Sequence, residues 1–172
     1  MFTSFYTQAV CGPSRSALLT GRYPCRSKGW GMPASEITFA ELIKGAGYQT
    51  ACIGKWDVSN RKPIIDRMPN AQGFDYFFGA LGANDPGSIK FHLNNEAAGT
   101  SKDMGGLTTL YTDKSIDFLK NKRDPKKPFI LYLAHTMMHT IIDASERFRG
   151  KSKGGLYGCL LYTSPSPRDF TE

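Results

Sequence analysis

Two segments of the chain repeat one pattern, a helix followed by a short apolar strand, and this repeat constrains the fold most. In the first segment, Thr38 and Glu41 fit a T-x-x-E capping box at a helix start, and residues 49–53 are typical of a buried strand. In the second, an uneven apolar stripe over residues 109–120 predicts a helix, and a continuous apolar run at 129–134 predicts a fully buried strand. We therefore expect an α/β fold with parallel strands.

Side chains able to do chemistry lie next to these expected elements. Lys55 and His139 each follow an expected strand, and Cys11 precedes an expected helix at residues 14–19 that ends at Gly21. Functional groups in parallel sheets gather at the carboxyl ends of the strands. The three positions are therefore candidates to converge there. Residues 58–106, rich in Gly, Asn and Pro, are expected to be mostly irregular.

Charge and composition narrow the functional classes. The chain has 172 residues and a formal net charge of +7, but its basic residues are not interleaved with aromatics, so we expect no nucleic-acid partner. The longest apolar run, 129–134, is far shorter than the roughly 20 residues of a membrane-spanning helix, and no signal peptide is visible. No CxxC pair occurs, which excludes zinc-ribbon and thioredoxin motifs; the four cysteines are Cys11, Cys25, Cys52 and Cys159.

The segment at residues 11–22, CGPSRSALLTGR, places a nucleophile-type residue ahead of a helix N-terminus. Backbone N–H groups and the helix dipole favour anions there, and Arg15 adds a planar cation. A cysteine-dependent phosphatase would need arginine six residues after Cys11, where Ala17 stands, so that class is excluded. From the residues alone, Cys11 is either a reactive thiol at a helix start or a buried structural cysteine.

The same segment is similar to the sulfatase signature C-x-P-S-R-x-x-x-L-T-G-R at every fixed position. Other segments resemble later landmarks of that family: GRYPCR, TFAELIKGAGYQTACIGKW, GFDYFFG and KPFILYLAHTMMHT. The resemblance covers residues 2–158 and implies an alkaline-phosphatase-like α/β fold, here incomplete, with a central mixed or parallel sheet flanked by helices. Residues 1–158 are then part of a sulfatase catalytic domain, and residues 159–172 are expected to form a disordered or non-native tail.

The resemblance implies a sulfuric ester hydrolase. In that family the cysteine matching Cys11 is oxidised to formylglycine, whose hydrated form, a geminal diol, attacks the sulfur of a sulfate ester. Arg15 matches the residue that steadies the diol. Lys55 matches a lysine that contacts the diol and the sulfate, and His139 matches the histidine proposed to protonate the leaving oxygen.

The resemblance also implies a set of partners. A divalent cation, usually calcium, takes the oxygen derived from Cys11 as a ligand and polarises the sulfate. A formylglycine-generating enzyme acts during biosynthesis, and the substrate is a sulfated small molecule or a sulfated saccharide. By family, the protein belongs to the secretory pathway, with an extracellular, lysosomal or periplasmic location.

The chain also departs from the family pattern. Asp57 stands where the family usually has histidine, in Gly-Lys-Trp-His, and we expect its charge to repel an anionic substrate. The family's Asp-Asp and Asp-Asn metal pairs are expected to lie outside this chain, and Asp85, Asp103 and Asp143 do not match them. We therefore expect a truncated fragment that is inactive alone.

Two alternative functions stay open. In the first, the chain is a phosphate or phosphonate ester hydrolase of the same superfamily. In the second, it is a non-catalytic fragment that binds anionic ligands. Rates on matched sulfate and phosphate esters separate the first alternative from a sulfatase. Salt-dependent binding without turnover would indicate the second.

Overall fold

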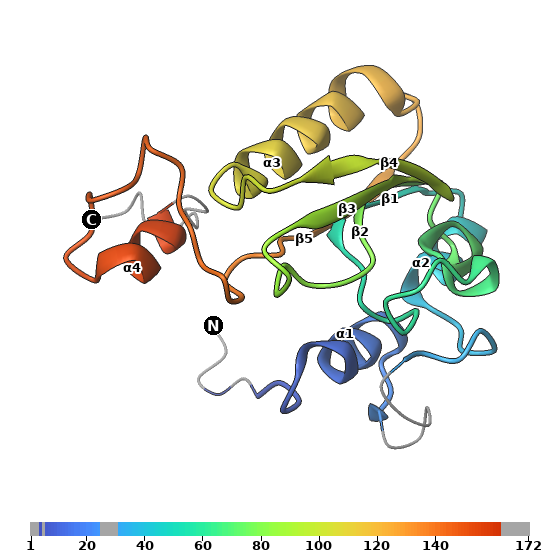
Figure 1. Cartoon of the computed structure of the whole chain (residues 1–172). Helices are drawn as coiled ribbons and strands as arrows, with labels where there is room; N and C mark the ends of the chain where they lie inside the picture. The colour runs from blue at the N-terminus through green and yellow to red at the C-terminus, as the bar shows by residue number, and fades with distance from the viewer. Residues whose placement is uncertain (1–3, 5, 25–30, 163–172) are drawn as a thin grey trace.

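A five-stranded mixed sheet forms the centre of the computed structural model, which describes residues 4, 6–24 and 31–162 (Figure 1). The strand order is β4-β3-β2-β1-β5. β1 (Gln49–Lys55) pairs in parallel with β2 (Tyr76–Ala80) on one side and with β5 (Phe129–Ala134) on the other. β3 (Ile89–Leu93) and β4 (Glu96–Ser101) extend the sheet beyond β2 as antiparallel strands. The expected parallel pairing of the two helix-then-strand segments is confirmed.

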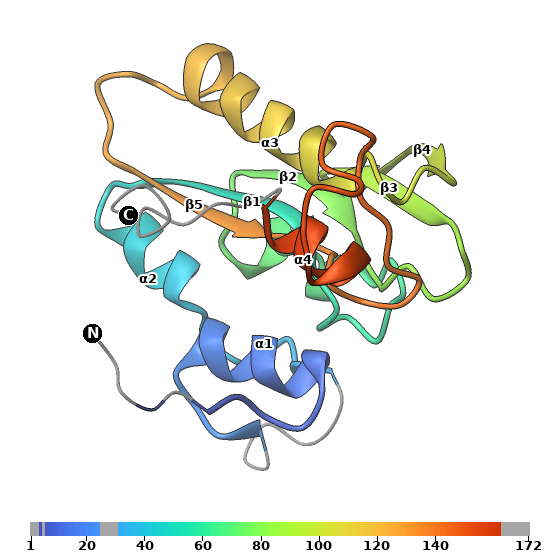
Figure 2. The ribbon, with the colours of Figure 1, turned by 90° about the vertical axis from the view of Figure 1, so that its left-hand side faces the viewer.

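Helices cover both faces of the sheet. α3 (Leu107–Asp117), which continues into a π-helical turn at Phe118–Lys122, lies on one face. α1 (Cys11–Thr20) and α2 (Phe39–Gly45) lie on the other face, as Figures 1 and 2 show from two sides. Two 3₁₀ turns, Ile65–Arg67 and Pro69–Gln72, connect β1 to β2. No helix among the described residues is long and apolar enough to span a bilayer.

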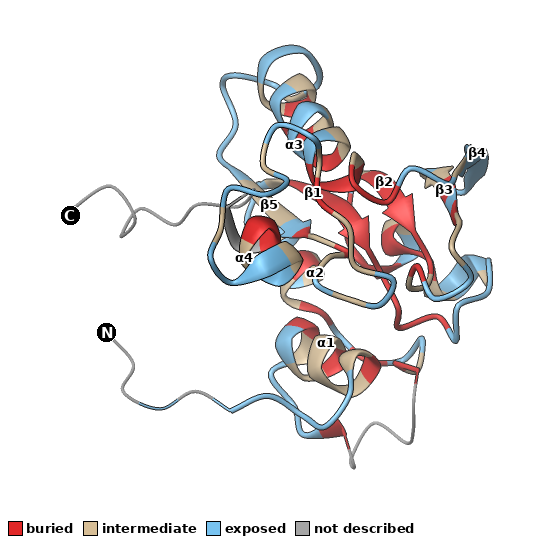
Figure 3. Cartoon of the chain, turned by 60° about the vertical axis from the view of Figure 1, so that its left-hand side comes forward, coloured by how far each residue is buried: buried red, intermediate tan, exposed pale blue. Residues whose placement is uncertain are grey.

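Alternation along β1 and β2 explains the two layers. Cys52 and Phe77 belong to the core beneath α1 and α2, together with Leu19 and Trp56. Their chain neighbours point to the opposite face and join the core beneath α3; this second core includes Ile53, Phe78, Leu107, Tyr111 and Phe118. Side chains of successive strand residues point to opposite faces, so one apolar strand can serve both cores. Figure 3 shows the buried residues concentrated in the central strands.

Local signals in the sequence set the helix ends. Both hydrogen bonds of the Thr38–Glu41 capping box are present at the start of α2. α1 ends at Gly21, whose φ of 66° is left-handed and whose N–H donates to the carbonyl of Ala17. α1 starts at Cys11, three residues before the expected start, because Pro13 fits within a first helical turn.

The structure departs from the sequence-based expectations in two places. Residues 58–106 contain three strands, β2, β3 and β4, that the sequence did not predict. Nearly all of β4 is exposed, so that strand carries no apolar alternation that a sequence reading could detect. β5 is a strand as predicted but is not fully buried: it is the last strand of the described sheet, and Phe129 and Leu133 are 40% and 38% exposed.

The segment that begins at residue 159 is expected to be a disordered or non-native tail. Its first four residues instead complete α4 (Gly155–Tyr162), where Cys159 and Leu160 are buried against Ala144. The remainder of that expectation, residues 163–172, lies outside the described residues, as does Cys25. The division of the chain at residue 158 stays a prediction.

Candidate active site at the carboxyl edge of the sheet

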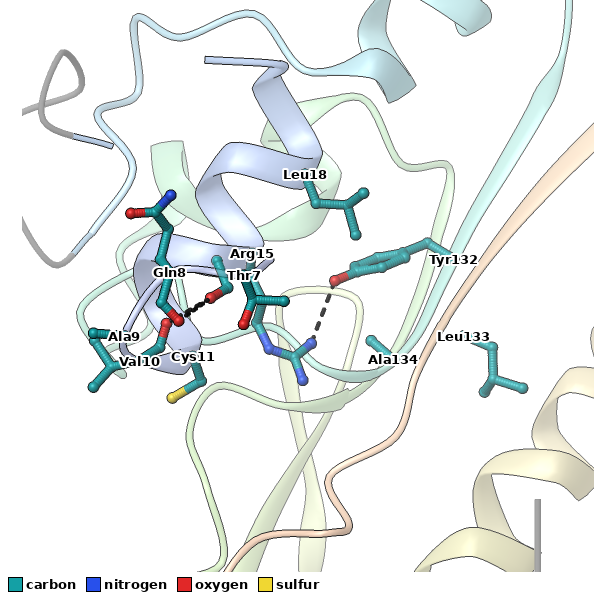
Figure 4. A pocket seen from close by; sticks show the side chains of 11 residues that line it. Thr7, Gln8, Ala9, Val10, Cys11, Arg15, Leu18, Tyr132, Leu133 and Ala134 are labelled. Carbon is teal, nitrogen blue, oxygen red and sulfur yellow. Dashed lines mark hydrogen bonds between the residues drawn. The ribbon is translucent and has the colours of Figure 1, made fainter. Parts of the chain in front are cut away.

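Cys11 is the first residue of α1 and lines a cavity of about 550 Å³ between that helix and β5 (Figure 4). Val10, at the N-cap, makes no side-chain cap hydrogen bond, and the first turn carries no acidic residue. The positive end of the helix dipole is therefore directed at the cavity without a side chain of the helix to neutralise it. Cys11 is partly exposed, whereas Cys52 and Cys159 are buried.

Arg15 joins α1 to the carboxyl ends of two strands. One guanidinium nitrogen donates to the carbonyl of Lys55 at 2.7 Å and to the Tyr132 hydroxyl at 3.3 Å; the other donates to the carbonyl of His135 at 3.4 Å. Figure 4 shows the guanidinium between Cys11 and Tyr132. All three acceptors are uncharged, and Arg15 has no carboxylate partner among the described residues. Its positive charge therefore remains available to an anion in the cavity.

Lys55 is the last residue of β1 and is buried with Asp57. The Lys55 ammonium lies 3.1 Å from Asp57 Oδ2, an ion pair rather than a well-aligned hydrogen bond, and both side chains are almost fully buried. Gly54 precedes them with a φ of 113°, and a Cβ at that position would lie 2.1 Å from the carbonyl oxygen of Ala134. Only glycine fits this close approach of β1 to β5.

Further ion pairs lead from Asp57 to His139. Asp57 Oδ1 accepts a hydrogen bond from Nε of Arg61 at 2.9 Å, and another nitrogen of Arg61 donates to Asp85 Oδ2 at 3.3 Å. Asp85 Oδ1 lies 2.9 Å from Nδ1 of His139. We call this set the ion-pair network; its members are Lys55, Asp57, Arg61, Asp85 and His139.

The structure brings the predicted residues to one edge of the sheet by two routes. Arg15 links α1 directly to the backbone of Lys55, and the ion-pair network links Lys55 to His139. Arg61 also lies within electrostatic reach of Cys11. Burial lowers the pKa of Arg61, but the hydrogen bond that Arg61 donates to Asp57 and the charges of Asp57, Asp85 and Cys11 outweigh burial and raise the pKa.

The expectation for Asp57 changes with this geometry. The sequence alone predicts a carboxylate that repels sulfate, but its charge is met by two cations, Lys55 and Arg61. The sequence reading missed Arg61 and Asp85. The opposite charges of Asp57 and Arg61, four residues apart, were a weak signal for one of them. No signal existed for Asp85, because only the turn after β2 brings it near His139.

Burial affects the other titratable side chains near the edge. Burial raises the pKa of Cys52 far above its usual range, which makes that thiol unreactive. Burial likewise raises the pKa of Tyr132, although the charge of Arg15 and its hydrogen bond act in the opposite direction. Burial lowers the pKa of His135, whose Nδ1 is buried without a hydrogen-bond partner in the described part of the chain.

The described residues do not fit a calcium site by themselves. Within the residues that the structure describes, no three His, Cys, Asp or Glu side chains come together in a way that could hold a metal ion. The carboxylate with the deepest burial at this edge, Asp57, is already paired with two cations. Calcium takes six to eight oxygen ligands, so the oxygen that Cys11 could supply is not sufficient.

Comparison with known proteins extends this description. The chain matches the family model described as Sulfatase over residues 1–159. It is 34% identical to an arylsulfatase of Hemicentrotus pulcherrimus over 91% of the chain, and 33% identical to an N-acetylgalactosamine-6-sulfatase of Mus musculus over 92%. It spans only 34% and 36% of the length of those two relatives.

One solved structure is similar in both fold and sequence. It was determined in complex with its substrate, D-glucosamine-2-N,6-O-disulfate. It superposes with a TM-score of 0.63 at 31% identity, covering 79% of this chain and 26% of that one. The mixed sheet between helices is therefore part of the alkaline-phosphatase-like fold of these proteins, and the described residues form only a portion of that fold.

Proposed function

The chain belongs to the sulfatase family, and from this premise we propose that it supplies the nucleophile side of a site that hydrolyses sulfate esters. The observation that carries the proposal is the position of Cys11. The residue begins a helix whose positive end is directed at a cavity, and Arg15 lies beside it without a carboxylate partner in the part of the chain that the structure describes. An anionic sulfate ester suits such a cavity better than a neutral ester does.

Formylglycine made from Cys11 would, once hydrated, supply an oxygen nucleophile for sulfur and would return to the aldehyde as sulfate leaves. Other residues of this chain bind and orient the sulfate on this side of the site. The N-terminal N–H groups of α1 and the Arg15 guanidinium bind sulfate oxygens and hold them for in-line attack. Lys55, which by resemblance matches a lysine that contacts the diol and the sulfate, lies at the end of β1 with its charge paired to Asp57.

His139 supplies the proton that the leaving alcohol oxygen needs. It lies five residues beyond β5, in a segment whose backbone is held by Asn84: the Asn84 amide donates to the carbonyls of His139 and Ile141 at 3.4 and 2.7 Å. General acids of this kind typically contribute about 10²–10⁴-fold to the rate. All of these roles are proposals for this chain.

A divalent cation, calcium by family resemblance, belongs to the complete site. We propose that Cys11, as formylglycine, gives it one oxygen and that its other ligands come from outside the described residues. Residues 1–172 alone are then expected to hydrolyse no sulfate ester, because the described part offers no cluster of metal ligands.

The substrate class that we propose is a sulfated saccharide. One similar relative is an N-acetylgalactosamine-6-sulfatase, and one similar structure holds a disulfated glucosamine. Both observations support a sugar, and the similarity to an arylsulfatase makes an aryl sulfate the substrate to compare it with. A formylglycine-generating enzyme is the proposed partner in biosynthesis, and the secretory pathway is the proposed location.

The test is hydrolysis by the protein that carries this chain, co-expressed with a formylglycine-generating enzyme. We expect release of sulfate from a sulfated monosaccharide in the presence of calcium, and complete loss of turnover in Cys11→Ala. Matched phosphate and phosphonate esters should react more slowly. Faster reaction of the phosphate ester would favour the alternative hydrolase, and saturable saccharide binding without turnover would favour a non-catalytic role.

A further inference from the structure

We propose that Arg61 and Asp85 are positioning residues for His139, and that they fix which ring nitrogen exchanges a proton with the substrate. The inference rests on the proposed function, in which His139 gives that proton to the leaving alcohol oxygen. Its structural part concerns only the ion-pair network and is testable without turnover.

Two acceptors determine the protonation of His139. Nδ1 of the ring forms a hydrogen bond of 3.0 Å with the carbonyl oxygen of Thr140, and Asp85 Oδ1 lies 2.9 Å from the same nitrogen as an ion-pair partner. Since a carboxylate and a carbonyl both only accept, Nδ1 must be the nitrogen that carries the hydrogen. Nε2 makes no hydrogen bond to any residue in the described part of the chain, so it is the nitrogen left for a substrate.

Asp85 is itself held in place from the opposite side. Its carboxylate is 43% exposed and would be mobile without a partner, but its second oxygen accepts from Arg61 at 3.3 Å. Arg61 uses its Nε for Asp57, which is fully buried and paired with Lys55. One planar guanidinium thus transmits the rigid position of a buried carboxylate to an exposed one, which the single ammonium of lysine could not do in the same geometry.

The backbone of residues 57–61 adopts an unusual conformation where Arg61 contacts Asp57 and Asp85. Asp57, Asn60 and Arg61 have φ values of 62°, 54° and 57°, left-handed conformations that side-chain-bearing residues rarely adopt. Gly82 leaves room for the Arg61 stem, because a Cβ there would lie 3.2 Å from Cδ of Arg61. Strained backbone of this kind persists where surrounding contacts enforce it, and it clusters at functional sites.

The consequence for the reaction is specific. When the bond between sulfur and the alcohol oxygen breaks, that oxygen takes a proton from Nε2 of the imidazolium. The neutral ring that remains carries its hydrogen on Nδ1, where the Thr140 carbonyl accepts it and the charge of Asp85 lies 2.9 Å away. The network therefore favours the tautomer that this step produces.

The first experiment reads the tautomer of His139 by long-range ¹H–¹⁵N correlation in the 172-residue chain. The chain has three histidines, so His92→Gln, His135→Gln and His139→Gln assign the signals. We expect a protonated Nδ1 and a bare Nε2 in neutral His139, whereas free imidazole favours the opposite tautomer. Asp85→Ala should shift both nitrogens toward the free-imidazole pattern, and Arg61→Met should shift them part of the way.

Arg67→Met is the matched control, since Arg67 lies on the neighbouring 3₁₀ turn and belongs to no ion pair of the network. Arg61→Lys should restore less than half of the wild-type pattern. A wild-type His139 with the free-imidazole pattern would overturn the proposal. So would an unchanged pattern in Asp85→Ala, because the Thr140 carbonyl would then fix the ring alone.

The second experiment uses kinetics in the converted protein that carries this chain. Asp85→Ala should lower kcat about a hundredfold for an alkyl sulfate, with little change in KM, since small misplacements of a reacting group cost about that much. For an aryl sulfate, whose leaving group needs less protonation, the loss should be much smaller. Equal losses for both esters would overturn the proton-transfer role even if the tautomer result holds, and inactivity of the wild type would overturn the proposed function alone.

Discussion

The two sides of the candidate site hold their cations in opposite ways. On the α1 side, Arg15 binds only neutral acceptors within the described residues, two carbonyls and a hydroxyl. On the β1 side, the cations of Lys55 and Arg61 are met by the carboxylates of Asp57 and Asp85. The uncompensated positive charge of the site therefore lies beside Cys11, and the ion-pair network serves to hold side chains in place.

The network should break most severely at its buried carboxylate. Asp57→Asn keeps the shape of the side chain and the tolerance for a left-handed φ, but it removes the charge between Lys55 and Arg61. Loss of one partner from a buried ion pair typically costs about 3–5 kcal/mol, because the other charge stays buried and unpaired. Urea denaturation should show a loss of this size in the free energy of unfolding.

Asp66→Asn is the control for that measurement, since Asp66 is exposed on a 3₁₀ turn and should change stability by less than about 0.5 kcal/mol. A loss below about 1 kcal/mol for Asp57→Asn would mean that Lys55 finds solvent or another partner. The network would then not be the rigid element that we describe.

The α1 side should lose activity more than stability. Arg15→Ala removes hydrogen bonds from a charged donor, worth about 1.5–3 kcal/mol in stability, and also the cation beside Cys11. We expect kcat/KM on a sulfate ester to fall at least about a hundredfold in the protein that carries this chain. Arg15→Lys keeps the charge and should recover part of the activity; equal losses in both variants would assign Arg15 a purely structural role.

Acid should weaken the fold through two half-buried histidines, His92 and His135. Burial lowers the pKa of His135 and of His92, and both Nδ1 atoms are buried without a hydrogen-bond partner in the described residues. The unfolded chain binds these protons first, so stability is full above about pH 6.5 and falls as pH drops below it, by at most about 1.4 kcal/mol per pH unit for each proton. His135→Gln should reduce the fall in melting temperature between pH 7 and pH 5. An unchanged fall would exclude His135 as a cause of the loss of stability in acid.

A partly exposed ion pair tests whether burial, rather than charge alone, makes the loss of an ion pair costly to stability. Lys44 and Asp75 lie 2.7 Å apart, with side chains 48% and 32% exposed. Burial acts to raise the pKa of Asp75, but bonds from Lys44 and Thr50 outweigh it and lower the pKa. Lys44→Ala should raise that pKa in an NMR titration and cost less than about 1 kcal/mol of stability. A loss of stability as large as that of Asp57→Asn would show that buried and exposed ion pairs contribute equally in this protein.

The sequence predicted what is local and missed what is assembled by topology. The capping box of α2, the glycine at the end of α1 and the strands β1 and β5 depend on neighbouring residues, and all are confirmed. β4 is exposed and polar, so no hydrophobic pattern marked it. The exposure of β5 depends on which strand lies beside it, and periodicity carries no information about that.

The residues of the candidate site also fall into those set by neighbouring sequence and those brought together by the topology of the sheet. Cys11 and Arg15 lie in one contiguous motif on one helix, so their proximity was predictable. Arg61 and Asp85 meet only because the loops after β1 and β2 end at the same edge of a parallel pair. The charge balance around Asp57 depends on those partners, so the residue alone did not indicate that two cations meet its charge.

Peptide mass analysis after co-expression with a formylglycine-generating enzyme tests the central claim, that Cys11 is the nucleophile position, most directly. The peptide containing Cys11 should carry an aldehyde in place of the thiol, and the peptides containing Cys25, Cys52 and Cys159 should carry none. Conversion should also persist in Asp85→Ala, since the network does not form the motif around Cys11. An unmodified thiol at Cys11 under conditions that convert a known sulfatase would contradict the account.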